Sequence, residues 1–149
     1  MKKFICMLVA GFCLLGSAAV QAQNPDRILG VYKAVEEGKE SKVRFTRRSD
    51  GSYQGQIFWL KNPNNPDGTP KYDLKNPDKS KRGIRSDQVV VVDGVKYNAK
   101  KNVWDGGRVY DPTKGKSYKV EVSFKDANTL RVKGSLLGIS RSVYWIKVQ

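Results

Sequence analysis

Short segments of alternating apolar and polar residues, separated by turn residues, limit the folds open to this chain more than any other feature. Between residues 26 and 148 no segment keeps a helical period for more than a couple of turns. Alternation is typical of strands with one buried and one solvated face, and closely spaced turns favour antiparallel neighbours. The pattern predicts one all-β domain over residues 23–149, with about eight short antiparallel strands.

Hairpin turns, rather than long crossovers, connect most of these predicted strands, and they favour an up-and-down, calyx-like barrel over a sandwich. The strongest turn signals lie at Ser49–Gly51, Asp93–Gly94, Asp111–Gly115 and Lys125–Thr129. The last of these turns aligns Val122 with Val132 and Val120 with Gly134, so that one inward face continues across three strands. A barrel of about eight strands has an interior that side chains fill or that holds one small ligand.

A pair of glycines, Gly106 and Gly107, interrupts the first strand of a predicted hairpin that runs from Trp104 to Tyr118. Two residues without Cβ atoms permit a bulge or a close approach of another backbone. The sequence therefore predicts an irregularity in the strand at this pair.

The register of the same hairpin depends on the length of its loop. With Asp111–Gly115 as the loop, Tyr110 faces Lys116 and Arg108 faces Tyr118. Arg108 would then share the inward, apolar face with Tyr118. An inward arginine among aromatic residues is unusual, and it marks this hairpin as a candidate site.

The first residues have the composition of a secretory signal peptide. Two lysines at positions 2 and 3 precede an apolar run over residues 4–15, and small residues fill the segment Ser17–Ala22. This pattern predicts cleavage near Ala22 and export to the periplasm or the medium. Both cysteines, Cys6 and Cys13, lie inside the predicted signal peptide, so the predicted mature domain has no disulfide.

The charge balance and the missing histidines narrow the classes of function. The chain has 28 Lys and Arg against 14 Asp and Glu, a formal net charge of +14, and no histidine. A basic surface attracts anionic partners such as lipid headgroups or acidic glycans, whereas export argues against nucleic acid as a partner. Without histidine, Ser-His-Asp and Cys-His catalysis and His-ligated metals are excluded. We expect no cofactor, no metal and no membrane-spanning segment.

Residues 61–86 break the strand pattern and predict a long flap loop. Four prolines lie in this segment, and about 25 residues without a period are long for a connection inside a compact domain. We expect an ordered flap across one end of the barrel, carrying the candidate residues Tyr72, Asp73, Asn76 and Asp78. Calcium is not expected there, because lysines and arginines lie between the carboxylates.

Several of these segments resemble a bacterial family of exported domains of unknown function, family 2147. The matching residues are Gly30–Tyr32, Gly55–Leu60, Asp73–Asp78, Trp104–Pro112, Gly115–Tyr118 and Gly134–Trp145. The resemblance covers nearly the whole predicted mature chain and implies a small lipocalin-like barrel. It implies no reaction, cofactor or substrate.

The aromatic residues and two arginines favour a noncatalytic binding protein for a small apolar or amphipathic, anionic ligand in the cell envelope. Aromatic rings supply contact area, and a guanidinium can hold a carboxylate or phosphate with two parallel hydrogen bonds. The candidate ligand-binding residues are Trp59, Trp104, Arg108, Tyr110, Asp111, Tyr118, Arg141 and Trp145. Periodicity leaves open whether Arg141, Val143 and Trp145 or the alternate residues of their strand face inward.

Two other functions fit the sequence. The first is an envelope interaction protein that binds anionic lipid or glycan through the basic residues of segment 71–85 and through Lys96, Lys100 and Lys101. The second is a hydrolase in which two of Asp73, Asp105 and Asp111 act as acid and base. Asp105 and Asp111 adjoin turns, where aspartate commonly accepts hydrogen bonds from backbone N–H groups, so catalysis is the less favoured interpretation.

Overall fold

The computed structural model describes residues 24–149. The predicted signal peptide, residues 1–22, and its cleavage site near Ala22 lie outside the described residues. None of the helices within residues 24–149 is long and apolar enough to cross a membrane.

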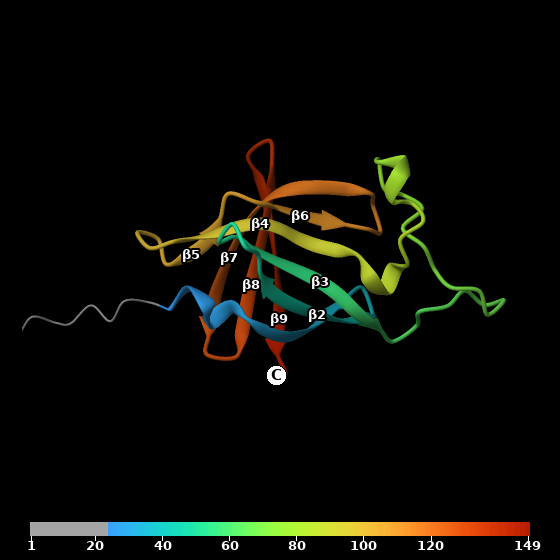
Figure 1. Cartoon of the computed structure of the whole chain (residues 1–149), viewed down its shortest axis with the longest axis horizontal. Helices are drawn as coiled ribbons and strands as arrows, with labels where there is room; N and C mark the ends of the chain where they lie inside the picture. The colour runs from blue at the N-terminus through green and yellow to red at the C-terminus, as the bar shows by residue number, and fades with distance from the viewer. Residues whose placement is uncertain (1–23) are drawn as a thin grey trace, which may run out of the picture.

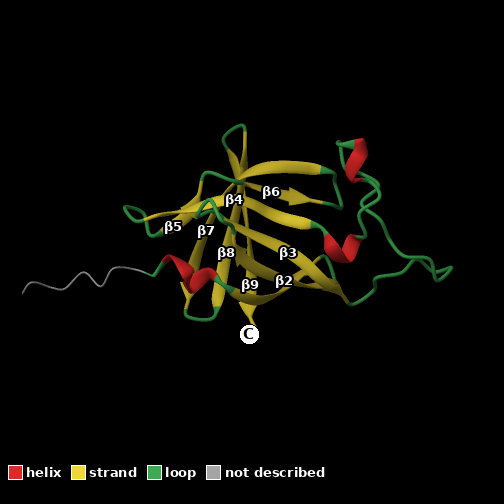
Figure 2. Cartoon of the chain, viewed as in Figure 1, coloured by secondary structure: helices red, strands yellow, loops and turns green. Residues whose placement is uncertain are grey.

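The described chain is an all-β structure with three short 3-10 helices (Figures 1 and 2). The helices are η1 (Pro25–Ile28), η2 (Lys79–Lys81) and η3 (Ser86–Gln88). The strands are β1 (Gly30–Glu36), β2 (Lys39–Arg47), β3 (Tyr53–Leu60), β4 (Val90–Asn98), β5 (Val103–Asp105), β6 (Arg108–Asp111), β7 (Lys116–Asp126), β8 (Thr129–Leu136) and β9 (Ile139–Lys147).

These strands form a closed antiparallel barrel in which neighbours in sequence are neighbours in space. The sheet order is β3-β2-β1-β9-β8-β7-β5-β4-β6, and pairing of β3 with β4 closes it. Because β5 and β6 occupy one position in the barrel wall, the barrel has eight strand positions. The predicted up-and-down barrel is therefore confirmed.

The glycine pair separates β5 from β6, as predicted. Gly106 has φ +80°, and Gly107 lies so close to β4 that an added Cβ would meet the carbonyl oxygen of Asp93 at 2.1 Å. Because the two backbones approach so closely, β5 and β6 together fill one strand position of the barrel, and they pair with β4 on either side of a bend in that strand.

The predicted turn at Asp93–Gly94 is wrong, because β4 runs without a break from Val90 to Asn98. Gly94 has φ +71° and stands opposite Gly107, where β4 changes partner from β6 to β5. A glycine after an aspartate is a strong turn signal, but here its positive φ bends a continuous strand.

The register between β7 and β8 matches the sequence prediction. Val122 pairs with Val132, and Val120 pairs with Gly134. The inward face of β9 carries Val143 and Trp145, which resolves the choice of face that periodicity left open.

One end of the barrel is closed by η1 and a packed aromatic cluster. Trp104 is fully buried, and its indole N–H donates to the carbonyl oxygen of Pro25 (3.1 Å). The Tyr32 hydroxyl donates to the carbonyl oxygen of Ile28 (2.9 Å), and the Arg27 guanidinium lies 5.4 Å from the Trp104 ring centroid. These contacts fix η1 over the end of the barrel.

The long connection between β3 and β4 leaves the barrel at the opposite end (Figure 1). It is a flap held by its own turns, by the isolated bridges Asn64–Pro70 and Tyr72–Arg85, and by the backbone hydrogen bond from the N–H of Asp73 to the carbonyl oxygen of Ile84 (2.9 Å). The outer turn of the flap extends away from the barrel in Figure 1.

Candidate functional site

A cavity of about 660 Å³ opens at the end of the barrel that carries the flap. The inner wall is apolar and comes from strands all around the barrel, because every second residue of each strand faces inward. The apolar lining residues are Ala34, Val43, Ile57, Leu60, Val91, Val109, Tyr118, Val132, Val143 and Trp145. A cavity of this size and character is suited to a small organic ligand.

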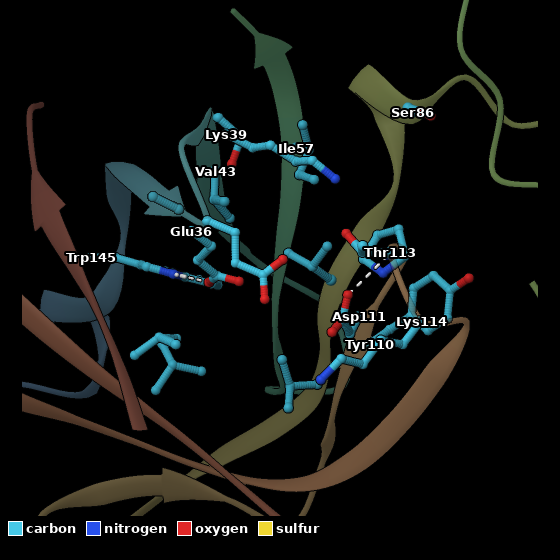
Figure 3. Close-up of a pocket in the computed structure, with 18 of the residues that line it drawn as sticks. Glu36, Lys39, Val43, Ile57, Ser86, Tyr110, Asp111, Thr113, Lys114 and Trp145 are labelled. Atoms are coloured by element: carbon cyan, nitrogen blue, oxygen red, sulfur yellow. Dashed lines mark hydrogen bonds between the residues drawn. The ribbon is translucent and has the colours of Figure 1, made fainter. Parts of the chain in front are cut away.

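Trp145 forms part of the inner wall and holds a carboxylate at the cavity edge. The Trp145 side chain is 4% exposed, and its indole N–H donates to Oε1 of Glu36 (3.2 Å). Figure 3 shows Glu36 and Trp145 on one side of the cavity and Asp111, Thr113 and Lys114 on the other. The hydrogen bond links β1 and β9 beyond their two backbone pairs, Tyr32–Lys147 and Lys33–Ile146.

The mouth of the cavity carries both signs of charge. Four carboxylates line it, on Glu36, Glu37, Glu40 and Asp111, together with four cations, on Lys39, Lys71, Lys114 and Arg141. Asp111 accepts a hydrogen bond from the backbone N–H of Thr113 (2.9 Å), which stabilises the β6–β7 turn. The mouth can therefore bind a polar or charged group while the inner wall holds apolar surface.

Tyr110 connects the barrel to the flap. Its hydroxyl donates to Oδ1 of Asp73 (2.8 Å), and Asn76 donates to Oδ2 of the same carboxylate (2.9 Å). Asp73 is only 2% exposed. Burial and the adjacent carboxylate of Asp73 raise the pKa of the Tyr110 phenol well above its usual range. This network fixes the flap against β6.

The structure brings five of the eight predicted ligand-binding residues to the cavity. These are Tyr110, Asp111, Tyr118, Arg141 and Trp145. They come from β6 and β7, which form the predicted hairpin, and from β9, the last strand of the chain.

Arg108 does not face the cavity, and the predicted register of its hairpin is wrong by one residue. Asp111, rather than Tyr110, pairs with Lys116, and Arg108 pairs with Lys119. The loop is four residues long instead of five, and a shift of one residue exchanges the two faces of a strand. Arg108 is exposed on the outer face and donates to the carbonyl oxygen of Ser117 (3.1 Å).

Trp59 and Trp104 also lie away from the cavity. Trp59 is 37% exposed on the outer surface, with the Lys42 ammonium 4.9 Å from its ring centroid. A bulge between Lys42 and Val43 shifts the register here, so that Ile57 and not Trp59 faces inward beside Val43. Trp104 belongs to the packed core of the closed end.

The flap residues have different surroundings. Asp73 and Asn76 are buried in the network with Tyr110, and Asp78 caps η2 by accepting from Ser80. Tyr72 is 44% exposed and lines a groove beside the mouth. The flap residues that reach the cavity itself are Asn62, Lys71 and Ser86.

Sequence reasoning missed the charged residues of the mouth at Glu36, Lys39 and Lys114. Glu36 and Lys39 flank the β1–β2 turn, and Lys114 lies in the β6–β7 turn. Charged residues near turns are common on any protein surface, so only the three-dimensional structure identifies these three as part of the mouth.

The three aspartates of the hydrolase interpretation do not converge on the cavity. Asp111 lines it, whereas Asp73 is buried in the flap network and Asp105 accepts from Asn98 (3.1 Å) on the edge formed by β4 and β5. No two of them share the cavity as an acid and base pair would require.

Comparisons with known proteins agree with this architecture. A family model described as "Uncharacterized protein conserved in bacteria (DUF2147)" matches residues 30–147. The chain is similar to the solved structure of protein HP1028 from the human pathogen Helicobacter pylori, described as belonging to the lipocalin family. The two are 24% identical with a TM-score of 0.63, over 81% of this chain and 82% of that chain, which shows a shared fold. No curated protein matches the sequence.

Proposed function

The chain belongs to the DUF2147 family of uncharacterised bacterial proteins, and we propose that it is a noncatalytic binding protein for a small apolar or amphipathic, anionic ligand. The observation that carries the proposal is the apolar cavity of about 660 Å³ that opens at one end of a lipocalin-like barrel. The signal peptide predicted from the first 22 residues supports a location in the periplasm or outside the cell.

The distribution of polarity supports an amphipathic ligand. The inner wall is formed by aliphatic side chains with Tyr118 and Trp145, while charged side chains lie at the mouth. A ligand with an apolar body and a polar end would bury the body and keep the end solvated. Such a ligand gains the free energy of apolar burial without desolvating its charge.

Arg141 supports an anionic end group. It precedes Val143 and Trp145 on the inward face of β9, and it makes no ion pair within 4.0 Å among the described residues. A guanidinium at this position can hold a carboxylate or phosphate with two parallel hydrogen bonds.

A pair of matched substitutions tests occupation of the cavity. Val143→Phe adds a ring to the cavity wall, whereas Val35→Phe adds the same ring at a position that is 54% exposed outside the barrel. We expect Val143→Phe to weaken binding of the fluorescent probe dansylundecanoate by at least roughly tenfold, equal to about 1.4 kcal/mol, and Val35→Phe to leave it unchanged.

Circular dichroism melting of both variants controls for folding. Native mass spectrometry of the protein from its own host then tests for a bound molecule that is lost on denaturation. Wild-type affinity in a folded Val143→Phe variant would contradict binding inside the barrel.

A second candidate, docking on an anionic lipid surface, is favoured by the β8–β9 hairpin. Its tip exposes three aliphatic side chains, Leu136 (47%), Leu137 (93%) and Ile139 (77%). Residues 127–149 contain four basic residues and no Asp or Glu. The hairpin projects from the barrel wall in Figure 1. An apolar tip flanked by cations fits the interface of an anionic membrane.

A further inference from the structure

A second hollow of about 350 Å³ lies between the flap and the mouth of the barrel. We refer to it as the flap groove. Its lining residues are Lys39, Asn65, Pro70, Lys71, Tyr72, Leu74, Lys75, Ser86, Pro112 and Thr113.

The flap groove adjoins the barrel cavity. Five residues line both hollows: Lys39, Lys71, Ser86, Pro112 and Thr113. A ligand long enough to extend past these shared residues would reach the flap groove. One ligand can therefore occupy both spaces.

The charge of the flap groove differs from the charge of the mouth. Three lysines line the groove and no Asp or Glu does, whereas the mouth carries four carboxylates. The ammonium of Lys71 donates to the carbonyl oxygen of Asn62 (3.0 Å), and that of Lys75 donates to the carbonyl oxygen of Thr113 (2.8 Å). Neutral carbonyls position these two ammonium groups without cancelling their charge.

None of Lys39, Lys71 and Lys75 forms an ion pair within 4.0 Å among residues 24–149. Each ammonium has three N–H donors, so Lys71 and Lys75 keep donors beyond those that the carbonyls use. The groove thus concentrates positive charge and hydrogen-bond donors at one place beside the apolar cavity.

The flap groove is held in place by contacts between the flap and the β6–β7 turn. Gly115 lies against Lys75 so closely that an added Cβ would meet the carbonyl oxygen of Lys75 at 2.1 Å. The bond from Tyr110 to the buried Asp73 anchors the same part of the flap to β6. The lysines therefore belong to a fixed wall and not to a free loop.

We propose that the flap groove is the subsite for the oxyanion, a carboxylate or phosphate, of an amphipathic ligand whose apolar part lies in the barrel. This proposal rests on the proposed binding function and adds the position of the charged group. Lys39, Lys71 and Lys75 recognise the oxyanion.

The test compares three probes that each contain ten carbon atoms in an unbranched chain: decanoate, decyl phosphate and decanol. Binding to the mature protein is measured by isothermal titration calorimetry. The variant Lys39→Gln/Lys71→Gln/Lys75→Gln removes the charge of the groove. The control variant Lys96→Gln/Lys100→Gln/Lys101→Gln removes the same charge from exposed positions on β4 and the β4–β5 turn, away from the mouth.

We expect the groove variant to weaken binding of the oxyanion probes by roughly tenfold or more and to leave decanol affinity unchanged. The control variant should leave all three affinities within about twofold of the wild type. A greater loss for decyl phosphate than for decanoate would assign a phosphate group to the natural ligand, and the reverse would assign a carboxylate.

Equal losses for all three probes, no loss, or an equal loss in the control variant would overturn the groove proposal while leaving binding in the barrel intact. Failure of the wild-type protein to bind any of the probes would instead overturn the proposed function, and the groove proposal with it. The two failures are therefore distinguishable.

Discussion

Tyr32 shows how one side chain stabilises the closed end of the barrel. It is fully buried, its ring packs edge-on against Phe45 with centroids 5.6 Å apart, and its hydroxyl donates to the carbonyl oxygen of Ile28. Burial raises the pKa of the Tyr32 phenol to about 12, because the phenolate would lose its hydration. The folded state therefore holds this proton more tightly than the unfolded chain does.

Tyr32→Phe should lower the free energy of unfolding by about 1 kcal/mol at neutral pH, because the carbonyl of Ile28 loses its buried donor. The wild type keeps its advantage below pH 10, where the unfolded tyrosine is also protonated. The advantage should shrink as the pH rises from about 10 to about 12, since the unfolded state then gains stability by releasing the proton.

Urea unfolding of both proteins at pH 7, 10 and 11 measures this difference. Tyr144→Phe, at a residue that is 46% exposed, controls for the loss of a surface phenol. If the difference in free energy of unfolding between wild type and Tyr32→Phe stayed constant up to pH 11, the raised pKa of Tyr32 would be contradicted.

Arg108 and Arg141 show what the sequence can say about single residues. Alternation placed both arginines in strands, but one residue of loop length decides which face of β6 points inward. The sequence does not fix that length, because Asp111, Pro112 and Gly115 fit loops of four or five residues. Arg141 faces the cavity on the same side of β9 as Val143 and Trp145, a choice of face that alternation alone left open.

At the scale of strands, the close approach of Gly107 to β4 allows two short strands, β5 and β6, to fill the place of one strand in the barrel. Gly107→Ala would place a methyl group 2.1 Å from the carbonyl oxygen of Asp93 and 2.7 Å from the backbone of Gly94. Because both neighbours are backbone, β4 and β6 must separate. We expect the free energy of unfolding to fall by about 2–4 kcal/mol.

Chemical denaturation measures the effect, and Gly83→Ala is the matched control. An added Cβ at Gly83 meets nothing within 4 Å, so we expect a change within about 0.5 kcal/mol. A Gly107→Ala variant as stable as the control would show that β4 and β6 tolerate separation.

The elements were easier to predict than the residues that line the site. The pairing of β7 with β8 followed from alternation and turn signals, which are local. The bend at Gly94 was missed because it depends on Gly107, thirteen positions later in the chain. The bulge that turns Trp59 outward likewise depends on the partner strand β2.

At the scale of the whole molecule, the two ends of the barrel have separate roles. The closed end holds the buried aromatic core under η1, and the open end brings together the mouth, the flap groove and the turns. The β8–β9 hairpin also belongs to the open end, because Gly134 and Arg141 line the cavity just before and after its tip. A protein that docks through this tip would hold its mouth near the lipid surface.

Leu137→Asn/Ile139→Thr tests docking through the tip. Leu137 has φ +51°, a conformation that asparagine adopts readily, so the first change removes an apolar side chain while suiting the turn. Ile139→Thr keeps β-branching at the start of β9. Ile146→Thr/Val148→Thr is the control, since it removes two exposed aliphatic side chains elsewhere on the outer surface.

Binding is measured by co-sedimentation with vesicles of phosphatidylglycerol and phosphatidylcholine. We expect the tip variant to lower the partition coefficient by at least roughly a hundredfold, because each of the two buried aliphatic side chains contributes about 1.5–3 kcal/mol. Salt should weaken the remaining binding by screening the basic residues of β8 and β9. Binding to vesicles that the tip variant leaves unchanged would contradict docking through the hairpin.

A wild-type dimer that the tip variant converts to a monomer, measured by analytical ultracentrifugation, would assign the tip to a second copy of the chain instead of a lipid surface.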